Sequence, residues 1–220
     1  MIATLWPSLS SQFLFEFGTM FVIINPYGLS FIFLNHTMAV TDDERRSLAR
    51  RISFNAFCVL VLSLFAGAPI LHFFGLSVSA LRVSGGLVVA AAGWSMLNEG
   101  IPDENQSRST LSYGALSRMT LFPLTIPLTA GPGSIATAIA LAANRPSWPL
   151  SSTLPYVVSI VVAAALSLII LHAYTYSSSM ARLIGRSGTH TISRLSAFLL
   201  FCVGVQIMIT GILDLARSII

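Results

Sequence analysis

The sequence predicts an all-α integral membrane protein whose six transmembrane helices form two inverted three-helix repeats. The first reason is composition, since 55% of the 220 residues are hydrophobic and only 9% are charged, whereas soluble domains are about 25% charged. The second is the number of apolar windows long enough to cross a bilayer. The third is a proline- and glycine-rich interruption in the first and fourth windows. We therefore expect the first and fourth helices to be broken.

Six windows meet the length requirement, because a spanning helix needs about 20 mostly apolar residues. In chain order they cover residues 10–38, 52–73, 80–98, 116–143, 153–174 and 193–215. Residues 1–220 are thus predicted to form a single membrane domain. Its first repeat covers about 10–98, a linker covers about 99–115, and the second repeat covers about 116–217.

The arginines predict the orientation, because Lys and Arg favour the cytoplasmic side of a membrane. Nine fall on one side of the predicted spans: Arg45, Arg46, Arg50, Arg51, Arg108, Arg118, Arg182, Arg186 and Arg194. Three fall on the other side: Arg82, Arg145 and Arg217. We expect a bacterial inner-membrane protein with both termini outside and cytoplasmic loops at 39–51, 99–115 and 175–192. The basic residues are dispersed and not interleaved with aromatics, so the net charge of +4 does not indicate nucleic-acid binding.

The first window is interrupted by "NPYG" at 25–28. Pro26 pushes Asn25 away from helical geometry. The fourth window is interrupted by "PLTAGPGS" at 127–134, where two prolines and two glycines make a continuous helix unfavourable. In lipid, unsatisfied backbone groups cost several kcal/mol each, so such breaks survive only when buried in protein or lining a cavity.

Paired interruptions at corresponding positions point to the binding site of a transporter. Each break creates a new helix N-terminus that suits a carboxylate, and the carbonyls before it suit an ammonium group or a cation. A small zwitterion fits both. The candidate binding residues are Asn25, Pro26, Gly28, Thr129, Ala130, Gly131, Gly133, Ser134 and Gln206. The alternative is that both breaks are ordinary proline kinks, which are common in spanning helices.

A weak internal similarity supports the repeat. "GLVVAAAGWSML" at 86–97 resembles "AFLLFCVGVQIM" at 197–208 with an offset of 111, which pairs Gly93 with Gly204. Pro26 pairs with Pro132 at the similar offset of 106. Because each half has three spans, the second repeat must be inverted relative to the first.

Two further polar residues lie inside predicted spans. Glu16 is a functional candidate, since an intramembrane carboxylate is costly to keep there. It could carry a coupling proton. The alternative, which we favour, is that Glu16 lies near the outer membrane interface and is hydrated. Gln206 either contacts the substrate or bonds to another helix. Cys58 and Cys202 are predicted to be packed in the core.

No chemistry-bearing pattern predicts an enzyme. The sequence lacks H-E-x-x-H, and no serine or cysteine has an obvious base partner within the spans. The ATP-binding pattern G-x-x-x-x-G-K-[ST] is also missing, so any transport must draw on gradients or exchange. We expect no cofactor and no metal. A channel and a non-transporting membrane scaffold remain as alternatives to a carrier.

The chain resembles the MarC family, also called UPF0056. The stretches that carry the resemblance are "NP" at 25–26, "LRVSGGLVVAAAGWSML" at 81–97, "IPLTAGPGSIATAI" at 126–139, "RLIGRSG" at 182–188 and "ISRLSAFLLFCVGVQIMITGI" at 192–212. The resemblance implies a six-span inner-membrane protein. It also implies transport of small neutral amino acids, because related members carry glycine and alanine, and it points to Asn25, Pro26 and 129–133. Glu16 departs from the apolar half-span that the resemblance implies.

Overall fold

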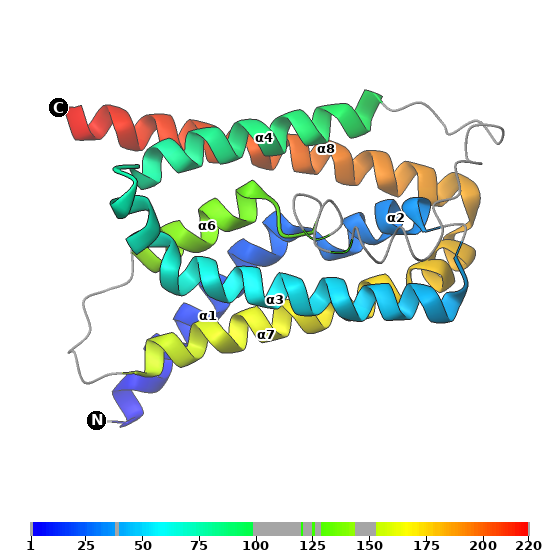
Figure 1. Cartoon of the computed structure of the whole chain (residues 1–220), viewed down its shortest axis with the longest axis horizontal. Helices are drawn as coiled ribbons and strands as arrows, with labels where there is room; N and C mark the ends of the chain where they lie inside the picture. Colours follow the sequence, from blue (N-terminus) through cyan, green and yellow to red (C-terminus); the bar gives the residue numbers. More distant parts are fainter. Residues whose placement is uncertain are drawn as a thin grey trace.

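A computed structural model describes residues 2–37, 40–98, 120, 125, 129–143 and 153–219 (Figure 1). Within these ranges the chain is almost entirely helical and contains no strand. The helices are α1 (Ile2–Ile24), α2 (Pro26–His36), α3 (Asp42–Phe73), α4 (Val78–Asn98), α6 (Pro132–Ala143), α7 (Leu154–Thr175) and α8 (Ser177–Ile219). This confirms the all-α fold class.

Five segments are long and apolar enough to cross a membrane: Leu9–Leu34, Asp42–Gly67, Val78–Asn98, Leu154–Thr175 and Thr191–Arg217. The first of them joins α1 and α2 across a break. Of the predicted fourth span, α6 is a shorter apolar helix, and much of 116–131 lies outside the described residues, as does the predicted linker at 99–115. The chain is therefore an integral membrane protein, and the sixth crossing stays a prediction.

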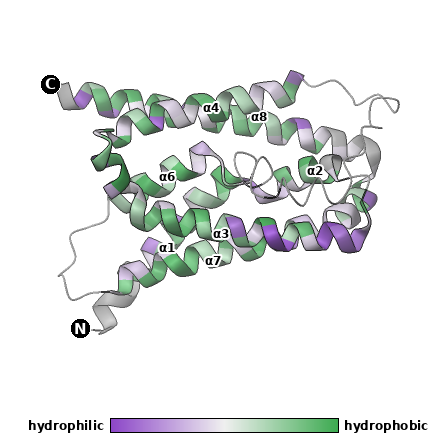
Figure 2. Ribbon diagram, viewed as in Figure 1, coloured by the Kyte–Doolittle hydropathy of each residue, from purple (hydrophilic) through white to green (hydrophobic). Residues whose placement is uncertain are grey.

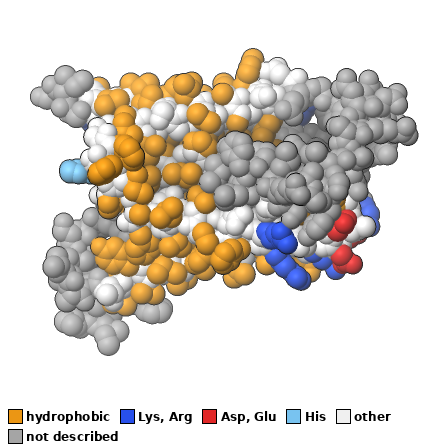
Figure 3. Space-filling model, viewed as in Figure 1, with side chains coloured by type: hydrophobic (Ala, Val, Ile, Leu, Met, Phe, Trp, Pro, Cys, Tyr) orange, Lys and Arg blue, Asp and Glu red, His pale blue; other side chains and the backbone are white. Residues whose placement is uncertain are grey.

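The outer surface suits a lipid environment. Hydrophobic residues cover most of each long helix, whereas hydrophilic residues gather at the start of α3 (Figure 2). Large apolar side chains stand exposed along the bundle, and they form a broad hydrophobic face in Figure 3. Cys58 and Cys202 are also exposed, so the prediction that they are packed in the core is wrong. On a membrane protein an apolar stretch can face lipid as easily as core.

The second and last spans begin differently from the prediction. Helix α3 starts at Asp42, so the arginine-rich segment before residue 52 is helical and not a loop. A capping box explains this start, because the Thr41 hydroxyl accepts from Glu44 N and the Glu44 carboxylate accepts from Thr41 N. The predicted loop at 175–192 is likewise mostly helical, with a kink at Gly185, whose φ is 78°.

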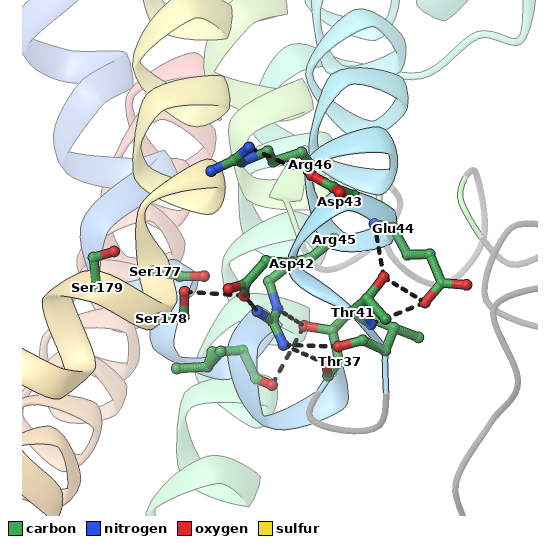
Figure 4. A network of polar contacts seen from close by, with 12 residues as sticks. Thr37, Thr41, Asp42, Asp43, Glu44, Arg45, Arg46, Ser177, Ser178 and Ser179 are labelled. Atoms are coloured by element: carbon green, nitrogen blue, oxygen red, sulfur yellow. Dashed lines mark hydrogen bonds and ion pairs between the residues drawn. The ribbon is translucent and has the colours of Figure 1, made fainter.

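A buried arginine closes the turn between α2 and α3. Arg45 donates to the Thr37 carbonyl at 2.8 Å and to the Asp42 carboxylate at 2.5 Å (Figure 4). The Ser178 hydroxyl, just after the start of α8, donates to the same carboxylate at 3.4 Å. These contacts tie the ends of three helices together at the arginine-rich end of the bundle.

Helices α4 and α8 cross at glycines. A Cβ placed on Gly93 would lie 2.8 Å from Phe201 Cα and 2.9 Å from Ala197 O, so only glycine allows the two backbones to approach this closely. The small residues of α4 therefore serve helix packing, as is common in membrane bundles.

The same arrangement recurs around the partner glycine. A Cβ on Gly204 would lie 2.8 Å from Ala90 Cα and 2.8 Å from Gly86 O. The two sets of contacts match residue by residue at an offset of 111. Gly204 corresponds to Gly93, Ala90 to Phe201, and Gly86 to Ala197. Interchanging α4 and α8 therefore converts the contacts of Gly93 into those of Gly204, as an inverted repeat requires. The offset of 111 is also the offset between the two similar sequence stretches.

Candidate functional site

The first break lies at Asn25, in the middle of the long axis of the bundle (Figure 1). Asn25 has φ 45° and ψ 58°, the left-handed region, and is the one non-glycine residue with positive φ among the described residues. Pro26 follows as the first residue of α2 and has no N–H to continue the ladder. The predicted break in the first span is confirmed.

Asn25 also caps the helix that it begins. Its side-chain carbonyl accepts from Gly28 N at 3.3 Å, which satisfies one of the free donors in the first turn. Gly28 is buried, and a Cβ placed on it would come within 2.5 Å of both the Asn25 amide nitrogen and the Ser196 hydroxyl. Ser196 lies on α8, so the break is packed directly against the second repeat.

The second break lies just before Pro132, where α6 begins near the middle of the same axis (Figure 1). Ala130 N donates to Thr125 O at 2.8 Å, five residues back, and therefore departs from α-helical bonding. The Gly131 carbonyl then accepts from Ile135 N at 3.0 Å and from the Ser134 hydroxyl at 2.9 Å. The break is confirmed at 130–131, and Pro127 lies outside the described residues.

A buried hydroxyl pair stands beside the second break. The Thr129 hydroxyl lies 2.8 Å from the Tyr174 hydroxyl, and either atom can donate. Both residues are buried, and the Tyr174 ring stacks on Phe33 of α2 with centroids 4.5 Å apart. This contact links the segment before α6 to α7 and to the half-helix after the first break. Nothing in the local sequence marked Tyr174 as part of the site.

The glycine after Pro132 has a packing role in the structure. A Cβ on Gly133 would collide with the Val89 side chain of α4, and one on Gly85 would lie 3.0 Å from Pro132 O. The start of α6 is therefore pressed against α4. Gly133 is one of the predicted binding residues, but these contacts are made with protein and give no support to a ligand beside it.

A cavity of about 940 Å³ lies between α1, α4, α6 and α8. Its lining reaches Val22 and Ile23, directly before the first break, and Thr137, one turn into α6. Arg82, near the start of α4, also lines it, which places the cavity toward the end of the bundle opposite the arginine-rich turn. Of the nine predicted site residues, Gln206 alone is in the lining.

Polar side chains are numerous in this lining. Besides Gln206, they are Ser11, Gln12, Glu16, Thr19, Arg82, Thr137 and Thr210. Arg82 forms an ion pair with Asp214 of α8, so its charge is partly balanced. Most of the exposed lining surface is nevertheless apolar, so the cavity is an apolar cleft with a few polar groups, as is common for small-molecule sites.

Glu16 is buried within the protein. Its side chain is 3% exposed, and its two carboxylate oxygens accept from Gln12 Nε2 at 2.8 Å and from the Ser159 hydroxyl at 2.7 Å. Gln12 also donates to Pro155 O at 3.1 Å. The carboxylate thus joins α1 to α7 and faces the cavity. The sequence indicated Glu16 as a candidate, and its predicted depth near the outer interface stays a prediction. No pattern in the sequence indicated Ser159 as its partner.

The described residues contain no group of three or more His, Cys, Asp and Glu side chains able to hold a metal ion. Together, the fold and this site define a polytopic α-helical membrane protein in which one helix is broken at Asn25 and a shorter helix, α6, begins at Pro132 near the middle of the bundle. A family model described as "MarC family integral membrane protein" matches residues 10–216. The chain belongs to the MarC family.

Relatives carry the same family name. The chain is 30% identical over 207 residues to "UPF0056 inner membrane protein MarC" of Citrobacter koseri and of Salmonella typhimurium, covering 89% of this chain and 91% of each relative. It is 29% identical over 204 residues to "UPF0056 membrane protein" of Archaeoglobus fulgidus, covering 93% of both chains. No solved structure matches the chain. These names place the relatives in a membrane and give no substrate.

Proposed function

We propose that this protein is a secondary transporter of small neutral amino acids or similar small zwitterions. It works by alternating access at a site between the two helix breaks. One observation carries the proposal: two half-helices, α2 and α6, begin in the middle of the bundle, and a cavity with polar side chains in its lining reaches Ile23, just before the first break, and Thr137, five residues into α6. A structural kink alone would not require such a cavity.

The chemistry of the breaks favours a zwitterion. Asn25 already accepts from the N–H groups of Gly28 and Leu29, and the Gly131 carbonyl accepts from Ile135 N. The remaining first-turn N–H groups of α2 and α6 would attract a carboxylate. Carbonyls at the end of α1 and around 128–131 would take the ammonium group. Asn25 and Thr129 would position the substrate, with Pro26, Gly28, Ala130, Gly131, Gly133 and Ser134 shaping the backbone around it. Gln206, in the cavity lining, would contact the substrate on its way.

Alternating access needs two halves that can exchange roles. The symmetric contacts of Gly93 and Gly204 support such halves. In an inverted repeat the two halves can exchange conformations, which converts a site open to one side of the membrane into a site open to the other side. In this picture the cavity is the access path from one side. The arginine distribution predicts that this side faces outside the cell, as do both termini.

The rival functions are a channel and a non-transporting scaffold. A flux assay with purified protein in liposomes separates all three. A carrier gives saturable uptake of labelled glycine or alanine that speeds up when unlabelled substrate is placed inside. A channel gives uptake that neither saturates at low concentration nor depends on internal substrate, and a scaffold gives none.

Cysteine scanning tests whether the cavity is the path. In a background with Cys58 and Cys202 replaced by Ala, Thr137→Cys lies in the cavity lining, and Leu87→Cys is a matched control exposed outside it. We expect a thiol reagent to block flux at Thr137→Cys only, and substrate to slow the reaction there. Full modification of Thr137→Cys without loss of flux would rule out this cavity as the path.

A further inference from the structure

Two rows of exposed side chains run side by side at the arginine-rich end of the bundle. On α3 the row consists of Arg46, Arg50 and Phe54, which lie four residues apart and therefore share one helix face. Two of its members are charged and near the helix start. The third is apolar, 66% exposed, and about 12 Å further along the helix at 1.5 Å per residue.

The second row lies on α7 and the residue after it. It consists of Leu168, His172 and Tyr176, again four residues apart. The His172 and Tyr176 rings are in contact, with centroids 4.8 Å apart. Leu168 is 65% exposed, and Tyr176 is 50% exposed. This row also changes along its length, from polar aromatic rings at the end of the helix to an apolar side chain further in.

The two rows run in opposite chain directions, but both have polar side chains at the arginine-rich end and an apolar side chain further into the bundle. Hydrogen bonds join the Ser53 hydroxyl to Ser167 O, and the Ser178 hydroxyl to Asp42. These two contacts set α3 and α7 antiparallel. The two arginines therefore lie beside the polar rings. Phe54 and Leu168 each follow a serine of the Ser53–Ser167 hydrogen bond, so they lie at a similar level along the bundle. A shallow hollow of about 290 Å³ opens between the rows, lined by Arg46, Arg50, Leu168, Leu171, His172, Thr175 and Tyr176.

We propose that this hollow binds the headgroup of an anionic phospholipid. The phosphate would sit between the guanidinium groups of Arg46 and Arg50, whose planar donors match phosphate oxygens. The polar edges of His172 and Tyr176 would complete the contact, and an acyl chain would lie along Leu168 and Phe54. Figure 3 shows arginine side chains gathered at this end, next to the hydrophobic face that meets lipid.

One acidic group lies nearby and must be weighed. The Asp43 carboxylate is 3.4 Å from Arg46, with both side chains well exposed. An exposed pair of this kind contributes little, about 0–1 kcal/mol. A lipid phosphate can therefore compete for Arg46. The apolar side of the hollow distinguishes a lipid from free phosphate, because inorganic phosphate would gain nothing from Leu168 and Leu171 in the lining or from the exposed Phe54 beyond it.

The experiment is native mass spectrometry of the full chain in detergent, titrated with phosphatidylglycerol or phosphatidylcholine of equal chain length. We expect preferential binding of phosphatidylglycerol. Arg46→Gln should weaken it about fivefold and Arg46→Gln with Arg50→Gln about 25-fold, at about 1 kcal/mol per arginine. The matched control is Arg182→Gln with Arg194→Gln, two exposed arginines outside the hollow, which should change the affinity less than twofold.

Several outcomes would overturn the proposal. Equal binding of both lipids by the wild-type protein would do so without any variant. An equal loss in the control pair would mean diffuse charge attraction. Competition by glycerol phosphate at the same concentration as the lipid would mean a simple anion site.

Discussion

At the scale of single residues, Asn25 explains how a helix can break within an apolar bundle. Its left-handed backbone ends α1, and its side chain bonds to Gly28 N and so starts α2. Asparagine is suited to both tasks, because it tolerates positive φ better than other residues with a side chain and is a strong N-cap. The break is therefore encoded by one dipeptide, Asn25 with Pro26.

Substituting Asn25 tests this double role. Asn25→Ala should lower the free energy of unfolding by about 1–2 kcal/mol or more, because both the cap and the tolerance of positive φ are lost. Asn25→Gly keeps the tolerance and should cost only a few tenths of a kcal/mol. Thermal unfolding of both variants in detergent measures the difference. If glycine proved as damaging as alanine, the backbone conformation would not be the cause.

Gly28 should resist even a methyl group. A Cβ there meets Asn25 and Ser196 at 2.5 Å, whereas a Cβ on Gly18 meets nothing within 4 Å. Gly28→Ala should therefore destabilise the protein by about 1–3 kcal/mol, while Gly18→Ala should be neutral or stabilising by about 0.5–1 kcal/mol. Ser196→Gly should rescue part of the loss at Gly28. Equal unfolding temperatures for the two alanine variants would contradict the close packing at the break.

At the scale of helices, the sequence predicts what depends on local chemistry and fails where distant parts meet. Proline fixes its own backbone, so both breaks were predictable. The capping box at Thr41 is visible in the sequence too. The prediction of a loop at 39–51 follows from selecting apolar windows, which leave out the charged first turns of α3. The Thr129–Tyr174 contact joins residues 45 apart, and the Glu16–Ser159 contact joins residues 143 apart. No local pattern signals such pairs.

The Glu16 contact should hold α1 against α7. A double-mutant cycle with Glu16→Leu and Ser159→Ala isolates the hydrogen bond between them. We expect a coupling free energy of about 1–3 kcal/mol in unfolding experiments, as for a buried hydrogen bond to an acidic group. Additive effects of the two substitutions would mean that the bond does not stabilise the helix pair. For flux, Glu16→Gln should matter much less than loss of the break, unless a proton is carried there.

At the scale of the whole molecule, the α4–α8 crossing relates the two halves. Gly93 and Gly204 occupy equivalent positions in it, so Gly93→Leu and Gly204→Leu should each destabilise the protein to a similar degree. Overpacking of this kind costs about 1–3 kcal/mol or more. Ala91→Leu, exposed on the same helix, is the control and should be tolerated. A large effect at one glycine and none at the other would argue against a symmetric crossing.

Orientation in the membrane is a separate prediction about the whole molecule. His72 is exposed at the end of α3, and Ser179 is exposed near the arginine-rich turn at the opposite end. In a cysteine-free background, His72→Cys should react with an impermeant thiol reagent in intact cells. Ser179→Cys should react only after the membrane is opened. The reverse pattern would place the arginine-rich end outside and invert the predicted topology.

The most direct test of the account is exchange-stimulated uptake by the purified protein in liposomes. Unlabelled alanine is loaded inside, and labelled glycine or alanine is added outside. We predict saturable uptake that internal alanine accelerates, and that Thr137→Cys loses when its thiol is modified. Uptake equal to that of protein-free liposomes, or a flux that neither saturates nor responds to internal alanine, would contradict the claim that this protein is a carrier of small zwitterions.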